Sequence, residues 1–157
     1  MTIQQFKAQP ETIKVLVIYP GPRPSEFISF PSNNTGNELR TLVGGWIELV
    51  RPKYFPMRKQ LDWSPVMVVN EDGVAQHLEY NKIASDVYLP GGSTFIYGTA
   101  VIMQEALFEV EEEEYAEPDL TGLPDDWALD NNFWGINKSD SQVKILAHFL
   151  RSELLIF

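Results

Sequence analysis

Cysteine is absent from this sequence of 157 residues, and histidine occurs only at positions 77 and 148. The chain therefore cannot form a disulfide framework or a thiolate metal site, and two histidines alone cannot complete a zinc site. No Ser-His-Asp order and no His-rich metal motif surrounds His77. We therefore name no catalytic residue, no metal and no cofactor, and the sequence favours a protein that is not an enzyme.

Long hydrophobic runs are absent as well. None approaches the roughly 18 residues that a membrane-spanning helix needs, and residues 1–5 lack the charged-then-apolar order of a signal peptide. The hydrophobic fraction of 44% and the length suit one ordinary globular domain. We therefore expect no membrane association and a location in the cytoplasm.

Basic residues are few and unevenly placed. The formal net charge is −10, from 22 acidic and 12 basic residues, and residues 83–137 contain no lysine or arginine. Duplex affinity comes largely from cations that displace counterions from phosphates, so direct nucleic-acid binding is not expected. The charge leaves open an acidic face that engages a basic protein or imitates nucleic acid.

The rest of the chain is organised around the stretch from Leu42 to Val50. Gly44 and Gly45 allow a tight reversal between a helix with apolar residues at helical spacing and a strand that begins at Trp46. We expect the helix at residues 37–43. Strand composition and turn signals predict strands at 13–19, 26–30, 46–50, 66–70, 74–78 and 94–102.

We predict an α+β fold: a small mixed or antiparallel sheet of about five or six strands, with one inserted helix and a C-terminal helix packed on one face. The expected organisation is a loose lead-in (1–12), a core (13–104), an acidic, aromatic-containing extension (105–139) and the C-terminal helix (140–157). The last helix carries more apolar surface than one sheet face needs, which makes a homodimer a hypothesis.

Several residues are candidates for binding a ligand. Arg51, Lys53 and Tyr54 mix cations with an aromatic ring, as a site for a nucleotide base and phosphate does, although a solvated surface loop has the same composition. Gly91 and Gly92 are able to present backbone amides to an anion, or to form a plain hairpin loop.

Two carboxylates and two amides are further candidates. Glu48, Glu71, Asn70 and Asn81 are able to fix a polar ligand or a divalent ion. The alternative is structural: Glu48 points outward from its strand, Asn70 adopts a turn conformation and Asn81 caps a short helix.

The acidic extension is a candidate surface for a protein partner. Its carboxylates and aromatics either dock on the core or form an exposed recognition patch. The candidate residues are Glu111, Glu112, Glu113, Glu114, Trp127 and Trp134.

Several motifs occur in a characteristic order. They are Lys14 to Gly21, the Val-Gly-Gly-Trp-Ile-Glu piece that ends at Glu48, Asn70 to Gly73, Asn81, and Gly92 with Thr94 to Gly98. The chain resembles, over about residues 14–100, an uncharacterised family of small domains found in bacteriophages, plasmids and other mobile elements. The resemblance implies a host cytoplasm as the location and makes Trp46 a further ligand-binding candidate. It supplies no reaction.

Three hypotheses about function follow. The first is a non-catalytic phage or mobile-element protein that captures a host molecule, either a nucleotide-like signal or a defence protein. The second is an acidic mimic of nucleic acid that blocks a DNA-binding host enzyme. The third is a small metal-dependent hydrolase that uses carboxylates.

Overall fold

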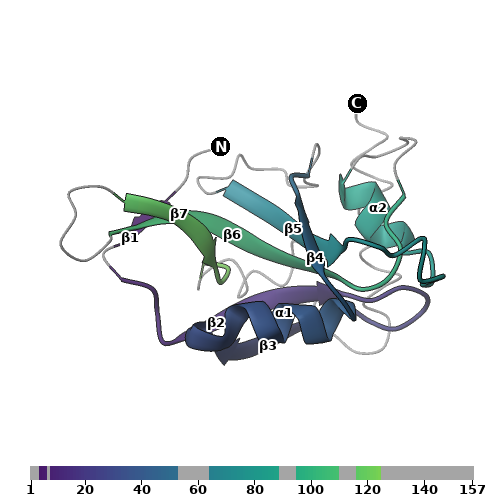
Figure 1. Ribbon diagram of the computed structural model, residues 1–157, viewed down its shortest axis with the longest axis horizontal. Helices are drawn as coiled ribbons and strands as arrows, with labels where there is room; N and C mark the ends of the chain where they lie inside the picture. Colours follow the sequence, from purple (N-terminus) through teal and green to yellow (C-terminus); the bar gives the residue numbers. More distant parts are fainter. Residues whose placement is uncertain (1–3, 7, 53–63, 89–94, 110–115, 125–157) are drawn as a thin grey trace.

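The computed structural model describes residues 4–6, 8–52, 64–88, 95–109 and 116–124, drawn in colour in Figure 1. These residues form one seven-stranded sheet with two α-helices and a short 3-10 helix. The strands are β1 (Gln4–Phe6), β2 (Thr12–Ile18), β3 (Glu26–Pro31), β4 (Ile47–Val50), β5 (Ser64–Asn70), β6 (Ala100–Glu109) and β7 (Ala116–Thr121). The helices are η1 (Ser32–Asn34), α1 (Thr35–Val43) and α2 (Lys82–Tyr88).

The longest strand, β6, is the spine of the sheet (Figure 1). The main order is β3-β2-β6-β5-β4, with every neighbouring pair antiparallel. Beyond the end of β2, β6 pairs antiparallel with β7, and beyond the end of β5 it pairs parallel with β1. Since residues 104 and 105 of β6 pair with both β5 and β7, those two strands lie on opposite edges of β6.

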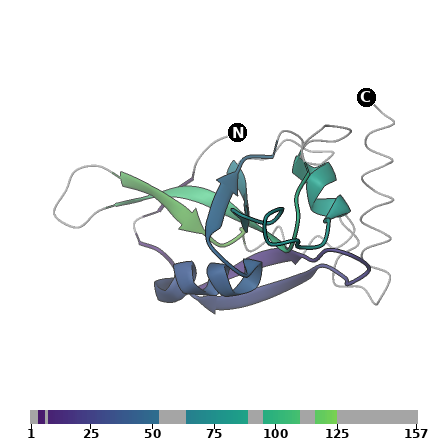
Figure 2. The same ribbon diagram turned by 45° about the vertical axis from the view of Figure 1, so that its right-hand side comes forward.

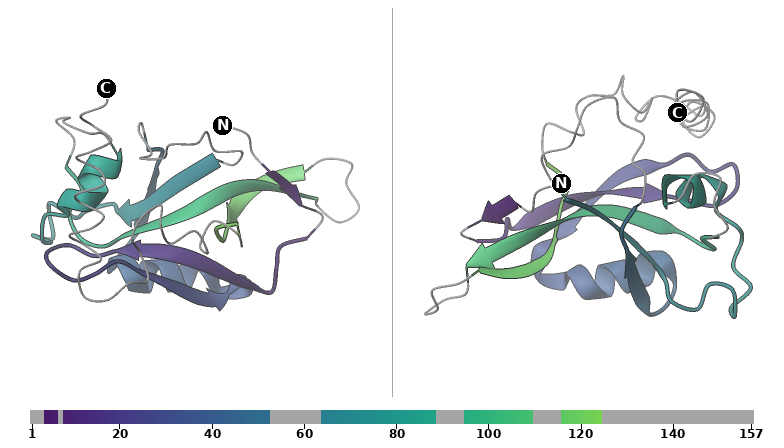
Figure 3. Two further views of the ribbon diagram at one scale, coloured as in Figure 1. Left: turned by 180° about the vertical axis from the view of Figure 1, so that it is seen from behind. Right: turned by 90° about the horizontal axis from the view of Figure 1, so that it is seen from above.

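Both faces of the sheet are covered, by α1 on one side and α2 on the other (Figure 3). Side chains alternate along each strand, so neighbouring residues of one strand enter different cores. Val66 and Val68 of β5 pack with Leu39 of α1, whereas Met67 and Val69 join the cluster of α2. This double burial explains the nearly continuous apolar composition of the central strands.

The paired glycines end α1 as expected. Gly44 has φ +80°, the left-handed conformation of a helix C-cap, and its N–H donates to the carbonyl of Arg40 over 2.8 Å. The N–H of Gly45 donates to the same carbonyl over 3.1 Å. The chain can therefore reverse directly into β4.

The mixed α+β class is confirmed, with corrections to individual elements. Residues 71–77 form a compact turn and not a strand, and α2, the short helix that Asn81 was expected to cap, extends to Tyr88. β6 begins at Ala100, after a left-handed Gly98 (φ +89°), and not at residue 94. The predicted C-terminal helix lies outside the described residues.

Two strands lie where the sequence indicated no regular structure. The lead-in (1–12) contains β1, and the acidic extension (105–139) contains β7. Both pair with the second half of β6. Each is stabilised by a long-range partner, which explains why its local composition gave no strand signal.

Candidate functional site

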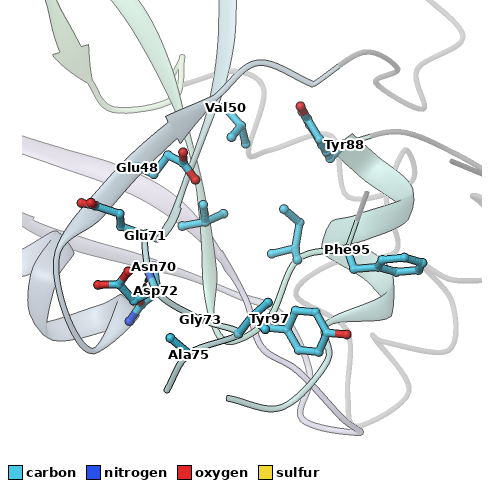
Figure 4. A pocket seen from close by; sticks show the side chains of 13 residues that line it. Glu48, Val50, Asn70, Glu71, Asp72, Gly73, Ala75, Tyr88, Phe95 and Tyr97 are labelled. Carbon is cyan, nitrogen blue, oxygen red and sulfur yellow. Dashed lines mark hydrogen bonds between the residues drawn. The ribbon is translucent and has the colours of Figure 1, made fainter. Parts of the chain in front are cut away.

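A hollow of about 570 Å³ lies on the α2 face of the sheet, between β4 on one side and Tyr88 with residues 95–97 on the other (Figure 4). The turn that follows β5 separates β4 from α2 (Figure 2). Because Glu48 pairs with Val69 and Val50 with Met67, both β4 residues face the side that α2 covers. The helix reaches only part of that face, which leaves room beside β4.

The floor of the hollow is apolar and one carboxylate is directed into it. Val50, Val69 and Ile96 line the space, and Val69 and Ile96 are almost fully buried. Figure 4 shows the side chain of Glu48 pointing from β4 into the space, whereas the carboxylates of Glu71 and Asp72 point outward at its rim. A ligand would therefore meet an apolar surface and a negative charge together.

Asn70 holds the rim in place. Its side-chain amide donates to the carbonyl of Val43 over 3.0 Å and to the side-chain oxygen of Gln76 over 3.2 Å. Its own side-chain oxygen accepts the N–H of Asp72 over 2.7 Å. With every polar atom of the amide in use, Asn70 is a positioning residue that ties the end of α1 to the turn.

Gly73 brings the turn against the far wall. A Cβ at this position would lie 2.7 Å from the carbonyl oxygen of Tyr97, so only glycine allows this approach. The φ of Gly73 is not in the left-handed region; the left-handed residue of this turn is His77, with φ 57°.

An aromatic cluster borders the hollow beside the turn. Tyr80 packs against Phe95 and Tyr97, with ring centroids 5.8 Å and 5.6 Å apart. Phe95 is 54% exposed. These rings widen the apolar rim beyond the floor.

The structure brings three of the predicted candidates together: Glu48, Asn70 and Glu71. Trp46 is 66% exposed and lies with the guanidinium of Arg40 5.3 Å from its ring centroid, outside the set that lines the hollow. Arg51 is bound to the carboxylate of Glu105 at 2.5 Å. The candidates Lys53, Tyr54, Gly91, Gly92, Glu111, Glu112, Glu113, Glu114, Trp127 and Trp134 lie outside the described residues.

Asn81 has a structural place. It is fully buried, and its amide donates to the carbonyls of Ile18 and Gly98, both over 2.9 Å. Its side-chain oxygen accepts the N–H of Ala84 over 3.0 Å, which caps α2. No polar atom of this side chain remains for a ligand.

The residues that line the hollow and were not candidates from the sequence include Asp72, Tyr88, Phe95 and Tyr97. The alternation of Phe95 and Tyr97 was the only available signal, and it indicated a strand. Among the described residues, no group of three or more His, Cys, Asp or Glu is placed to hold a metal ion, and no helix is long and apolar enough to cross a membrane.

Residues 13–117, more than half of the chain, match a family described as a domain of unknown function, DUF3846. The resemblance to an uncharacterised family, which rested on residues 14–100, is confirmed to that extent. Comparison with curated proteins and with solved structures gave no match.

Proposed function

We propose that this chain, which belongs to the DUF3846 family, is a non-catalytic binding protein that captures a basic segment of a partner protein in the hollow between β4 and α2. The partner is a host protein, and the setting is the phage or mobile element that the sequence resemblance implies. In this setting capture serves counter-defence.

The observation that supports the proposal is the position of Glu48 above an apolar floor. A lysine or arginine side chain combines a hydrocarbon stem with a terminal cation, and such side chains bury the stem along apolar surface. The stem would lie on Val50, Val69 and Ile96 while the cation meets Glu48 (Figure 4). Glu71 and Asp72 at the rim add negative potential that attracts a cation.

The same hollow is poorly suited to a nucleotide-like signal. Phosphate recognition uses cationic side chains or converging backbone amides, and none of the described residues that line the hollow is Lys, Arg or His. Arg51, the nearest cation in sequence to β4, pairs with Glu105 and is not among the described residues that line the hollow. Of the two host molecules in the first hypothesis, the geometry favours the protein.

The test is a titration of isotope-labelled protein with N-acetyl-lysine methylamide, followed by methyl NMR. We expect the methyl signals of Val50, Val69 and Ile96 to shift. Glu48→Gln should weaken binding roughly tenfold, the loss of about 1.4 kcal/mol of attraction. Glu11→Gln removes the same charge from an exposed position elsewhere and should leave binding unchanged.

If Glu48→Gln and Glu11→Gln weaken binding of the lysine probe equally, the binding is general electrostatic attraction to the protein. That result would overturn the site. Shifts of the same methyls with adenosine monophosphate, and none with the lysine probe, would overturn the choice of a protein partner.

A further inference from the structure

The outer edge of β4 is a candidate site for an added strand. β4 is the last strand of the main sheet order, and in the described part of the chain it pairs with β5 alone. A strand at the edge of a sheet offers unpaired N–H and C=O groups to another chain. In β4 this edge adjoins the hollow, because Glu48 and Val50 belong to both.

The register shows which backbone groups face outward. The N–H of Glu71 donates to the carbonyl of Trp46 over 2.9 Å, so these opposed residues form a hydrogen-bonded pair. Such pairs alternate along an antiparallel ladder, and the next ones along β4 are therefore at Glu48 and Val50. The N–H and C=O groups of Ile47 and Leu49 consequently point away from β5.

The two faces of this edge differ in chemistry. Glu48 and Val50 face the hollow, whereas Ile47 packs with the α1 cluster. Leu49 follows Ile47 by two residues on the same face and is 44% exposed. A strand added here would place every second side chain beside Glu48 and the others beside Leu49.

We propose that the partner segment binds as an extended strand added to β4, hydrogen-bonded to Ile47 and Leu49, with alternating basic and apolar side chains. This inference rests on the proposed function and names the form of its partner. Strand addition is a known mode in which main-chain bonds provide affinity and alternate side chains provide specificity. Charge argues against a second copy of this chain, since like charges on paired strands repel and the net charge is −10.

The probe is an acetylated and amidated peptide of alternating lysine and valine, seven residues long by design to exceed the four residues of β4. We expect hydrogen exchange of the Ile47 and Leu49 amides to slow at least roughly tenfold when the peptide binds. The amides of Glu48 and Val50 are already bonded to β5 and should change little. Uniform slowing, or none at Ile47 and Leu49, would overturn strand addition.

A second peptide carries N-methyl groups on alternate backbone amides, prepared in both registers, with the charges intact. If one of the two N-methylated peptides no longer binds, its blocked amides form the hydrogen bonds to β4, which supports strand addition. If both peptides bind fully, strand addition is overturned. In that second case, sensitivity to Glu48→Gln would still support the lysine site of the proposed function. If neither peptide binds and the lysine probe does not bind either, the proposed function is overturned, and strand addition is overturned with it.

A protein variant gives an independent check. Leu49→Pro removes an outward N–H and keeps the bonds to β5, as proline does on edge strands. It should lose peptide binding while the methyl shifts with the lysine probe remain, and Leu49→Ala should retain both. If exchange at Ile47 and Leu49 slows as the protein concentration increases, with no peptide present, the edge pairs with a second copy of the chain. That result would overturn the proposal.

Discussion

At the scale of single residues, two buried asparagines have all their polar side-chain atoms hydrogen-bonded, mostly to backbone groups. Asn70 is 6% exposed and Asn81 is 0% exposed, and each amide donates twice and accepts once. Leaving such partners unsatisfied costs more than an average hydrogen bond contributes. These residues position the turn and α2, whereas in the proposed function it is the carboxylate of Glu48 that recognises the partner.

Substitution of glycine by alanine is expected to have opposite effects on stability at two positions. Gly73→Ala places a Cβ 2.7 Å from the carbonyl oxygen of Tyr97 and should destabilise the fold by about 1–3 kcal/mol. Gly36 lies in α1 with nothing within 4 Å of an added Cβ, so Gly36→Ala should stabilise by up to about 1 kcal/mol. Urea unfolding measures both, and a loss of stability in Gly36→Ala would contradict the helix assignment.

Tyr19 is expected to titrate at high pH. Burial raises the pKa of its phenol above 10.0, and the hydrogen bond and charge of Glu26 raise it further, against the opposing charge of Arg23. Since the folded pKa exceeds that of the unfolded chain, the folded form holds this proton more tightly. Its contribution to stability is complete below pH 10 and is lost as the pH rises through the folded pKa.

The measurement is a carbon NMR titration of labelled tyrosine, with Tyr19→Phe to assign the signal. Glu26→Gln should lower the pKa of Tyr19 while burial keeps it above the ordinary value. An unchanged midpoint in Glu26→Gln would show that the carboxylate does not act on the phenol.

At the scale of elements, α2 is attached to the sheet by a polar clamp as well as by its apolar residues. Asn81 links the end of β2 to Gly98, and Ser85 accepts the N–H of Ile96 over 2.8 Å. Ile83, Ala84 and Val87 then enter the core. The clamp therefore holds α2 against the end of β2 and against residues 96–98, where Ile96 and Tyr97 line the hollow.

Asn81→Ala should destabilise the protein by about 2–4 kcal/mol, because two buried carbonyls and the N–H of Ala84 lose their partner. Asn33 is exposed, and Asn33→Ala should change stability by less than about 0.5 kcal/mol. Thermal and urea unfolding compare the two variants. Equal stability of both would rule out the clamp.

At the scale of the whole molecule, the net charge of −10 acts on folding and on binding in opposite directions. Self-repulsion destabilises a compact charged chain, while the same negative field attracts a cationic partner. Salt screens both interactions.

Raising ionic strength from about 0.01 M to about 1 M shortens the Debye length from roughly 30 Å to roughly 3 Å. We expect the urea midpoint to rise and the affinity for the lysine-valine peptide to fall. Glu11→Lys reduces the net negative charge at an exposed position and should diminish the gain in stability. A midpoint that falls with salt would show that net attraction outweighs repulsion among the charges of the folded protein.

The sequence by itself determined the features that depend on neighbouring residues. The apolar runs around Val15 and Val68 predicted central strands, and the glycine pair predicted the end of α1, because side-chain period and backbone freedom are local properties. The mixed class and the family resemblance followed from the same stretches.

Only the tertiary structure decided the site. Glu48 and Ile96 are far apart in the chain and share the hollow because β5 pairs with β4 and α2 covers just part of one face. β1 and β7 have weak local signals and are strands because β6 is long enough to pair with them. Long-range pairing depends on which surfaces remain to be buried once the core has formed, and no local pattern records that.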